Sequence, residues 1–142
     1  MGSRRKSREA ALKILYAVDV SGQTAEQALA AYFEHFAEEG EEREFAAELV
    51  RGVGTELERL DAAIRTASQN WRLERMARVD RNILRLATYE LLYVAEIPPL
   101  VTINEAIDMA KKYSTKKSGH FVNGILDHIR TTVAPEAKRG PA

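Results

Sequence analysis

Apolar side chains recur along this chain at the three- and four-residue spacing that is typical of amphipathic helices. A clear example is the stripe of Phe45, Leu49, Val53 and Leu57, whose members share one helical face. No segment alternates apolar and polar residues with a period of two, so we expect no strand. The sequence therefore predicts an all-α protein. The expected helices span residues 3–20 or 7–20, 24–39, 41–68, 73–76, 79–94, 102–113 and 118–133.

Local signals at the helix ends support these boundaries. Thr24 and Gln27 have the spacing of a capping box, in which a hydroxyl and an amide satisfy each other's backbone N–H groups. A second box is predicted at residues 102–105, with Val101 as its hydrophobic staple. Ser118 is expected to cap the last helix.

The chain has 142 residues, which is the usual size of a single domain. The helical periodicity is interrupted at Asn70 and Trp71. We therefore expect about seven helices that form two packed bundles, residues 1–69 and residues 70–133. Residues 134–142 contain two prolines and a glycine and are expected to fray.

Composition argues against several classes of function. The absence of cysteine removes disulfides, thiolate catalysis and cysteine-based metal sites. His35, His120 and His128 lack the spacing of a metal-binding motif, and no nucleotide-binding glycine loop or serine nucleophile motif is present. We therefore expect no metal, no cofactor and no enzymatic activity. No apolar run is long enough for a membrane span, and the basic N-terminus has no following hydrophobic region, so we expect a cytoplasmic protein without a membrane partner.

Charge is unevenly distributed, although the formal net charge is zero. Residues 1–13 hold five basic side chains against one acidic one, whereas residues 34–61 hold ten carboxylates against three arginines. Residues 65–85 carry six arginines against two acids, and residues 111–120 carry four lysines and no acid. Each run on its own could be a solvated helix face. Their segregation nevertheless favours a protein that steers a charged partner.

Two basic clusters fall at predicted helix starts, where the helix dipole disfavours cations and favours bound anions. The first cluster comprises Arg4, Arg5, Lys6 and Arg8. The second comprises Lys116 and Lys117, preceded by Lys111 and Lys112. Phosphate binding explains both clusters. Phe121 lies beside the second one, where it is either a core residue of its helix stripe, as spacing alone favours, or a platform on which an unpaired base stacks.

Five motifs of this chain resemble the NusB transcription antitermination factors. They are residues 4–8 (RRKSR), 79–91 (VDRNILRLATYEL), 103–106 (INEA), 110–114 (AKKYS) and 121–127 (FVNGILD). The resemblance covers nearly the whole chain, and the combination of INEA with FVNG is specific. It implies a fold of two perpendicular helical bundles.

The resemblance also implies a function and a set of binding residues. Family members bind single-stranded boxA-type RNA of nascent transcripts together with the ribosomal protein NusE, and then join an RNA polymerase antitermination complex. Carried onto this sequence, the RNA contacts are Arg4, Arg5, Lys6, Arg8, Lys111, Lys112, Lys116, Lys117, Phe121 and Asn123. The candidate NusE contacts are Tyr16, Asp19, Asp80, Arg81 and Arg85.

Other interpretations stay open at this point. Asp80 fits a first-turn helix acid as well as a partner contact, and Asn123 fits a plain surface amide. Lys117 stands where some family members carry an acid, a departure that should raise the electrostatic affinity for RNA. A NusB-like domain also precedes the catalytic domain of some ribosomal RNA methyltransferases, but this chain has no cofactor-binding strand or catalytic cysteine. A helical homodimer with purely solvated basic faces is the structural alternative.

Overall fold

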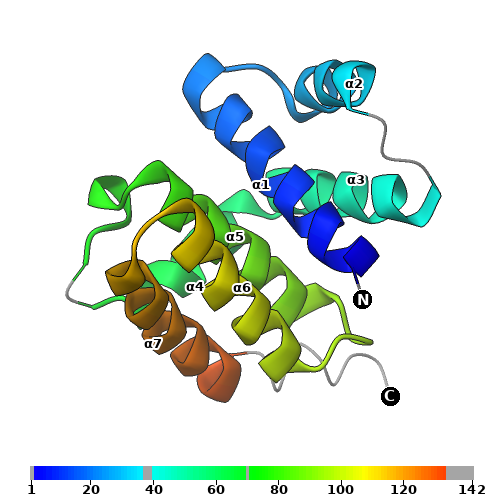
Figure 1. Cartoon of the computed structure of the whole chain (residues 1–142). Helices are drawn as coiled ribbons and strands as arrows, with labels where there is room; N and C mark the ends of the chain where they lie inside the picture. Colours follow the sequence, from blue (N-terminus) through cyan, green and yellow to red (C-terminus); the bar gives the residue numbers. More distant parts are fainter. Residues whose placement is uncertain (1, 37–39, 70, 134–142) are drawn as a thin grey trace.

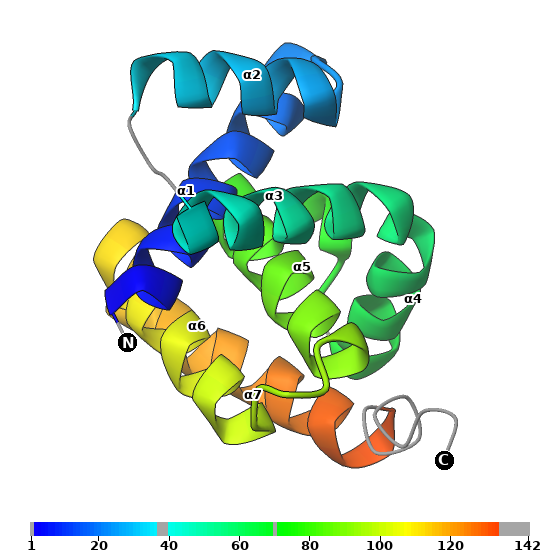
Figure 2. The same ribbon diagram turned by 90° about the vertical axis from the view of Figure 1, so that its right-hand side faces the viewer.

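The computed structural model describes residues 2–36, 40–69 and 71–133 (Figures 1 and 2). Throughout these residues the regular structure is helical, which confirms the predicted all-α class. The helices are α1 (Gly2–Ser21), α2 (Ala25–His35), α3 (Gly40–Thr55), α4 (Leu57–Ala67), the 3-10 turn η1 (Leu73–Arg75), α5 (Arg78–Tyr93), α6 (Pro99–Tyr113) and α7 (Lys116–Thr132). The tail expected to fray, residues 134–142, lies outside the described part of the chain, as does Asn70.

The first three helices form the N-terminal group, in which α1 packs against α2 and α3 (Figure 1). The predicted capping box at the start of α2 is confirmed. Thr24 Oγ1 accepts a hydrogen bond from the backbone N–H of Gln27 at 3.1 Å, and Gln27 Oε1 accepts one from the N–H of Thr24 at 3.0 Å.

The prediction of a single helix over residues 41–68 is wrong, because the helical geometry is interrupted between α3 and α4. The backbone leaves helical geometry at Glu56 (φ −101°, ψ 17°), next to Thr55 and Gly54, which both have low helix propensity. The break turns α4 so that it packs against α5 and α7 rather than continuing along α3 (Figure 2). By its contacts α4 therefore belongs with the C-terminal helices, although it lies within residues 1–69.

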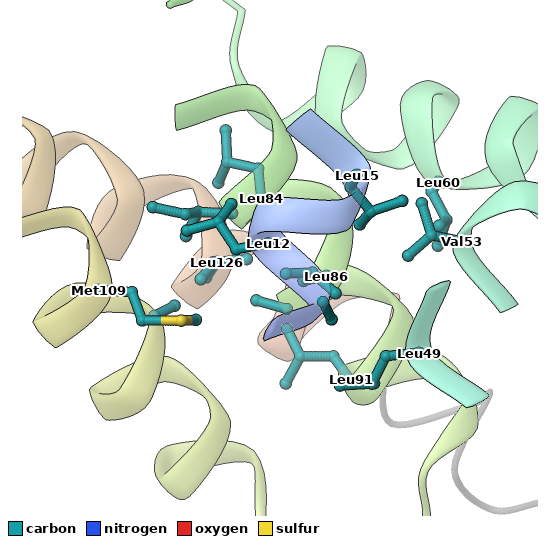
Figure 3. Packing of buried hydrophobic residues seen from close by; sticks show 14 of the residues in the cluster. Leu12, Leu15, Leu49, Val53, Leu60, Leu84, Leu86, Leu91, Met109 and Leu126 are labelled. Carbon is teal, nitrogen blue, oxygen red and sulfur yellow. The ribbon is translucent and has the colours of Figure 1, made fainter. Parts of the chain in front are cut away.

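Helix α5 is the centre of the molecule and contacts α1, α3, α4, α6 and α7. Its apolar residues join one continuous core that receives side chains from both groups of helices (Figure 3). Three members of that core, Leu84, Leu91 and Leu126, are fully buried. Because one core links both groups, the positions of α1 and α7 are fixed relative to each other.

Two predicted helix starts are wrong by a few residues. Helix α6 begins at Pro99, whose fixed φ and missing N–H suit the first helical position, so residues 102–105 form no capping box. Helix α7 is capped by Thr115, whose hydroxyl accepts from the N–H of Ser118 at 3.1 Å. Lys116 and Lys117 thus lie within the first turn of α7 rather than before it.

Among the described helices, none combines the length and the apolar character that crossing a membrane requires.

Candidate nucleic-acid interface

The four basic residues expected near the start of α1 have different surroundings. Arg8 is only 3% exposed, and its guanidinium pairs with the buried carboxylate of Glu90, at 2.7 Å from Nε and 2.9 Å from Nη2. Thr102 donates its hydroxyl proton to the same carboxylate at 2.9 Å. The structure therefore argues against the expectation that Arg8 contacts RNA. A buried charge pair of this kind holds α1, α5 and α6 together.

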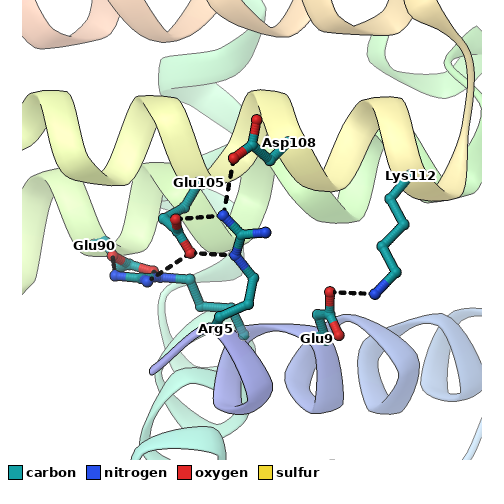
Figure 4. A network of polar contacts seen from close by, with 7 residues as sticks. Arg5, Glu9, Glu90, Glu105, Asp108 and Lys112 are labelled. Carbon is teal, nitrogen blue, oxygen red and sulfur yellow. Dashed lines mark hydrogen bonds and ion pairs between the residues drawn. The ribbon is translucent and has the colours of Figure 1, made fainter. Parts of the chain in front are cut away.

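Arg5 lies at the surface but is held by two carboxylates of α6 (Figure 4). Its Nε and Nη2 atoms each lie 2.6 Å from the Glu105 carboxylate, and Nη2 also donates to Asp108 at 2.9 Å. The hydrogen bond from Arg5 holds the pKa of Glu105 below its usual value. About a third of the Arg5 side chain stays exposed.

The other two residues of this cluster are open to solvent to different degrees. Arg4 is partly buried, and its guanidinium lies 4.1 Å from the ring centre of Phe45. Lys6 is exposed. Arg4 also lines a hollow with Glu41, Glu44 and Glu48, and one of its guanidinium nitrogens is buried, so this arginine faces α3. Arg5 and Lys6 are called the α1 basic surface below.

The lysines of α6 and α7 continue from this surface. Lys112, at the end of α6, pairs with Glu9 of α1 at 2.9 Å, so the C-terminal end of α6 lies beside α1 (Figure 4). The stem of Lys111 lies against Gly119 of α7, where a Cβ would be 3.3 Å from its Cε. Lys116 and Lys117 follow after the short turn into α7, and both are exposed. Cations thus run from α1 across the end of α6 to the start of α7.

This row of cations ends at an open pocket of about 650 Å³, which we call the aromatic pocket. It is lined by Trp71, Arg72, Arg75, Met76, Ala77, Asp80, Lys117, Ser118 and Phe121. The rings of Trp71 and Phe121 meet edge to face, with centres 5.5 Å apart and an interplanar angle of 81°. Phe121 is partly buried against the core and also lines the pocket, so the two roles that its position suggested are both compatible with the structure.

Asp80 also lines the aromatic pocket. Its Oδ2 accepts a hydrogen bond from the hydroxyl of Ser118 at 3.0 Å, while its buried Oδ1 has no hydrogen-bond partner within the described part of the chain. Asp80 is therefore placed beside the candidate RNA residues Lys117 and Phe121. Asn123 is exposed on α7 and is not among the residues lining this pocket.

Most of the expected NusE contacts bind other residues of the same chain. Asp19 of α1 pairs with Arg81 at 2.6 Å, and Arg85 pairs with the buried Asp61 at 2.8 and 3.0 Å. Burial alone would raise the pKa of Asp19, but the hydrogen bond and charge of Arg81 hold that pKa below its usual value. Tyr16 differs from these residues because 42% of it is exposed.

Sequence reasoning missed the residues that shape the aromatic pocket. In the sequence Trp71 marks only an interruption of periodicity, and Arg72 and Arg75 belong only to a charge run. The signal that could have found them is an arginine-rich segment around an isolated tryptophan, a composition suited to stacking and phosphate contacts. Within the described residues, no group of three or more potential ligands is placed to hold a metal ion.

Comparison with known proteins identifies the family of this chain. The family model described as NusB family matches residues 5–131. The transcription antitermination protein NusB of Sorangium cellulosum is 49% identical over 91% of this chain and 92% of its own length. The protein of the same description from Anaeromyxobacter dehalogenans is 47% identical over 99% of both chains.

Solved structures show the same fold. A structure of NusB from T. maritima has a TM-score of 0.88 at 41% identity and covers 97% of both chains. A crystal structure of the antitermination factors NusB and NusE in complex with dsRNA has a TM-score of 0.85 at 29% identity, covering 92% of this chain and 98% of the other. The relatives are transcription antitermination proteins and not enzymes. This chain belongs to the NusB family.

Proposed function

We propose that this protein is a cytoplasmic RNA-binding factor of transcription antitermination, which binds boxA-type RNA together with NusE and then joins an RNA polymerase complex. The single observation that carries the proposal is the row of cations from the α1 basic surface to the aromatic pocket. The similar fold of a NusB chain solved with NusE and RNA supports it further.

The two ends of this row suit the two chemical parts of a nucleic acid. Exposed lysines and arginines bind phosphates through an electrostatic interaction that does not depend on base sequence and weakens as salt rises. Trp71 is 63% exposed and presents its ring beside Phe121, which gives an unpaired base a surface for stacking. Asp80 lines this pocket and accepts a 3.0 Å hydrogen bond from Ser118 in the first turn of α7. We therefore assign Asp80 to the positioning of the RNA site rather than to NusE.

The candidate surface for NusE is the exposed face near the end of α1. Tyr16 and Val20 are one helical turn apart, and 42% and 52% of their surfaces are exposed. Exposed aromatic and aliphatic groups of this kind are typical of the centre of a protein interface. The ion pair of Asp19 and Arg81 joins α1 to α5, and the ion pair of Arg85 and Asp61 joins α5 to α4. The same face is our candidate for self-association, which light scattering without RNA would detect.

The experiment that tests RNA binding is a titration of labelled boxA-type single-stranded RNA at several salt concentrations. Affinity should fall steadily as salt rises, because bound cations release counterions from the RNA. Lys117→Ala should weaken binding to all sequences and make the salt dependence shallower, while Trp71→Ala should cost about tenfold through lost stacking. Arg51→Ala is the control, since Arg51 is an exposed arginine of α3 paired with Glu26. An affinity that is insensitive to salt, or that both variants leave unchanged, would contradict the proposal.

A further inference from the structure

A second hollow adjoins the aromatic pocket and shares the Trp71–Phe121 pair with it. Its volume is about 380 Å³, and its lining comes from the end of α4, the residues that follow it and one face of α7. Trp71 and Phe121 line both hollows. We call it the histidine groove, because His120 and His128 of α7 also line it.

The floor of the histidine groove is open because of a glycine. Gly124 lies midway between His120 and His128, one helical turn from each, so the three share one face of α7. A Cβ at Gly124 would have no atom within 4 Å. The two imidazoles thus flank an empty floor, which is open above and bounded at one end by the exposed ring of Trp71.

The chemistry of the histidine groove suits a nucleotide. Imidazoles stack on bases and donate hydrogen bonds to phosphate or to base edges. The exposed amide of Gln69 adds a donor and an acceptor at the rim. No carboxylate is among the residues lining this groove, so nothing there repels a phosphate.

From these observations we propose that the histidine groove binds a further base of the same RNA strand, next to the base that stacks in the aromatic pocket. The inference rests on the proposed function, because the shared aromatic pair makes the groove a continuation of that site. The RNA strand then passes over Trp71 and Phe121, with one base on each side of the pair. Single-stranded nucleic-acid sites are commonly built from successive aromatic platforms beside cations.

Blocking the groove without disturbing the fold tests this inference. Gly124→Leu places a side chain on the empty floor, and it should not lower the melting temperature, because Gly124 is exposed and leucine favours a helix over glycine. The double variant His120→Ala/His128→Ala removes the flanking imidazoles instead. His35→Ala is the matched control, since His35 is an exposed histidine on the distant helix α2.

The readout is the affinity for single-stranded RNAs of graded length, from about 4 to about 16 nucleotides. Gly124→Leu and the double histidine variant should weaken binding of the longer RNAs about tenfold and leave the shortest bound RNA unaffected. If both variants bind every length as wild type does, while Lys117→Ala still weakens binding, the groove inference is wrong and the proposed function stands. If the wild type binds none of these RNAs, both are wrong. Loss of NusE binding with unchanged RNA binding would assign the groove to a protein and overturn the inference.

Discussion

At the scale of single residues, neighbouring arginines on one helical turn have separate tasks. Arg8 lies inside the molecule against Glu90, whereas Arg5 lies at the surface between Glu105 and Asp108. A basic run in the sequence therefore contains both structural and binding cations. The run alone could not separate them, because the difference depends on carboxylates about 80 to 100 positions further along the chain.

The carboxylates around Arg5 should compete with RNA phosphate for its guanidinium. Asp108 is exposed, and the contact found for it is with Arg5, so Asp108→Asn should remove one of the two carboxylates that hold Arg5 without harm to the fold, while Glu105 stays paired with it. We expect RNA affinity to rise about two- to threefold at low salt, a size typical of exposed charge pairs. Glu26→Gln is the control, because it also removes one carboxylate and releases one arginine, far from the α1 basic surface. Equal RNA affinities of the two variants would show that Arg5 is not restrained in this way.

The buried pair of Arg8 and Glu90 should matter for stability rather than for RNA. Glu90→Gln keeps the shape of the side chain but leaves the Arg8 charge without its main partner at a 3% exposed position. We expect the free energy of unfolding to fall by about 3 kcal/mol, as when one member of a buried ion pair is removed. Chemical denaturation measures the change, with the exposed Glu74→Gln as a control that should lose less than about 1 kcal/mol. Equal losses of unfolding free energy in the two variants would mean that the buried pair contributes no more to stability than an exposed pair does.

At the scale of helices, amphipathic periodicity predicts the type of the elements but neither their ends nor the division of residues 41–68 into two helices. The break at Glu56 is invisible in the sequence pattern, because the apolar residues on both sides keep the same helical spacing. The predicted cap of α7 is Ser118, whereas the observed cap is Thr115. Both are hydroxyl residues near the helix start, and only the backbone geometry decides between them. The role of Trp71 escapes the pattern for a similar reason: its partner Phe121 lies 50 positions away.

Two glycines of α3 provide a matched test of helix packing. The Tyr89 ring of α5 occupies the place where a Cβ of Gly52 would lie, whereas a Cβ at Gly54 would have no atom within 4 Å. Gly54→Ala should stabilise the protein by up to about 1 kcal/mol through helix propensity. Gly52→Ala should be less stable than Gly54→Ala by about 1 kcal/mol or more, because Tyr89 must move. Thermal denaturation of both variants compares them, and equal stabilities would contradict the packing of α3 on α5.

At the scale of the whole molecule, ion pairs join helices that are distant in the sequence. Glu105 links α6 to α1 and Asp19 links α1 to α5, and the pKa of each carboxyl lies below its usual value. A carboxyl with a lowered pKa stabilises the folded state above its unfolded pKa, and that stability is lost as pH falls through the folded pKa. The unfolded pKa is about 4 for these groups.

We therefore expect constant melting temperature near neutral pH and a decline that begins as pH falls below about 5. Glu105→Gln should be less stable than wild type at neutral pH, and the difference should vanish only as pH falls through the lowered pKa of folded Glu105, where the wild-type carboxyl becomes protonated. Calorimetry across this range follows both proteins. A constant difference between them at all pH values would show that the charge of Glu105 does not contribute.

The whole molecule also places two proposed binding surfaces on one rigid core. The Tyr16 face lies near the end of α1, while the RNA row extends from the start of α1 to α7. The family resemblance predicted both functions from sequence motifs, but the division of residues between them needed the fold. Asp80, expected on the NusE side, lines the aromatic pocket.

The most direct test of the account is the affinity of this chain for boxA-type RNA, measured with and without saturating NusE. We expect NusE to tighten RNA binding, and RNA to tighten NusE binding by the same factor, because linkage makes the coupling reciprocal. Lys117→Ala should weaken RNA binding in both conditions. Tyr16→Ala should abolish the increase in RNA affinity that NusE causes and should leave RNA binding without NusE unchanged. RNA binding that is absent in both conditions, or that NusE leaves unchanged, would contradict an antitermination factor that binds RNA and NusE together.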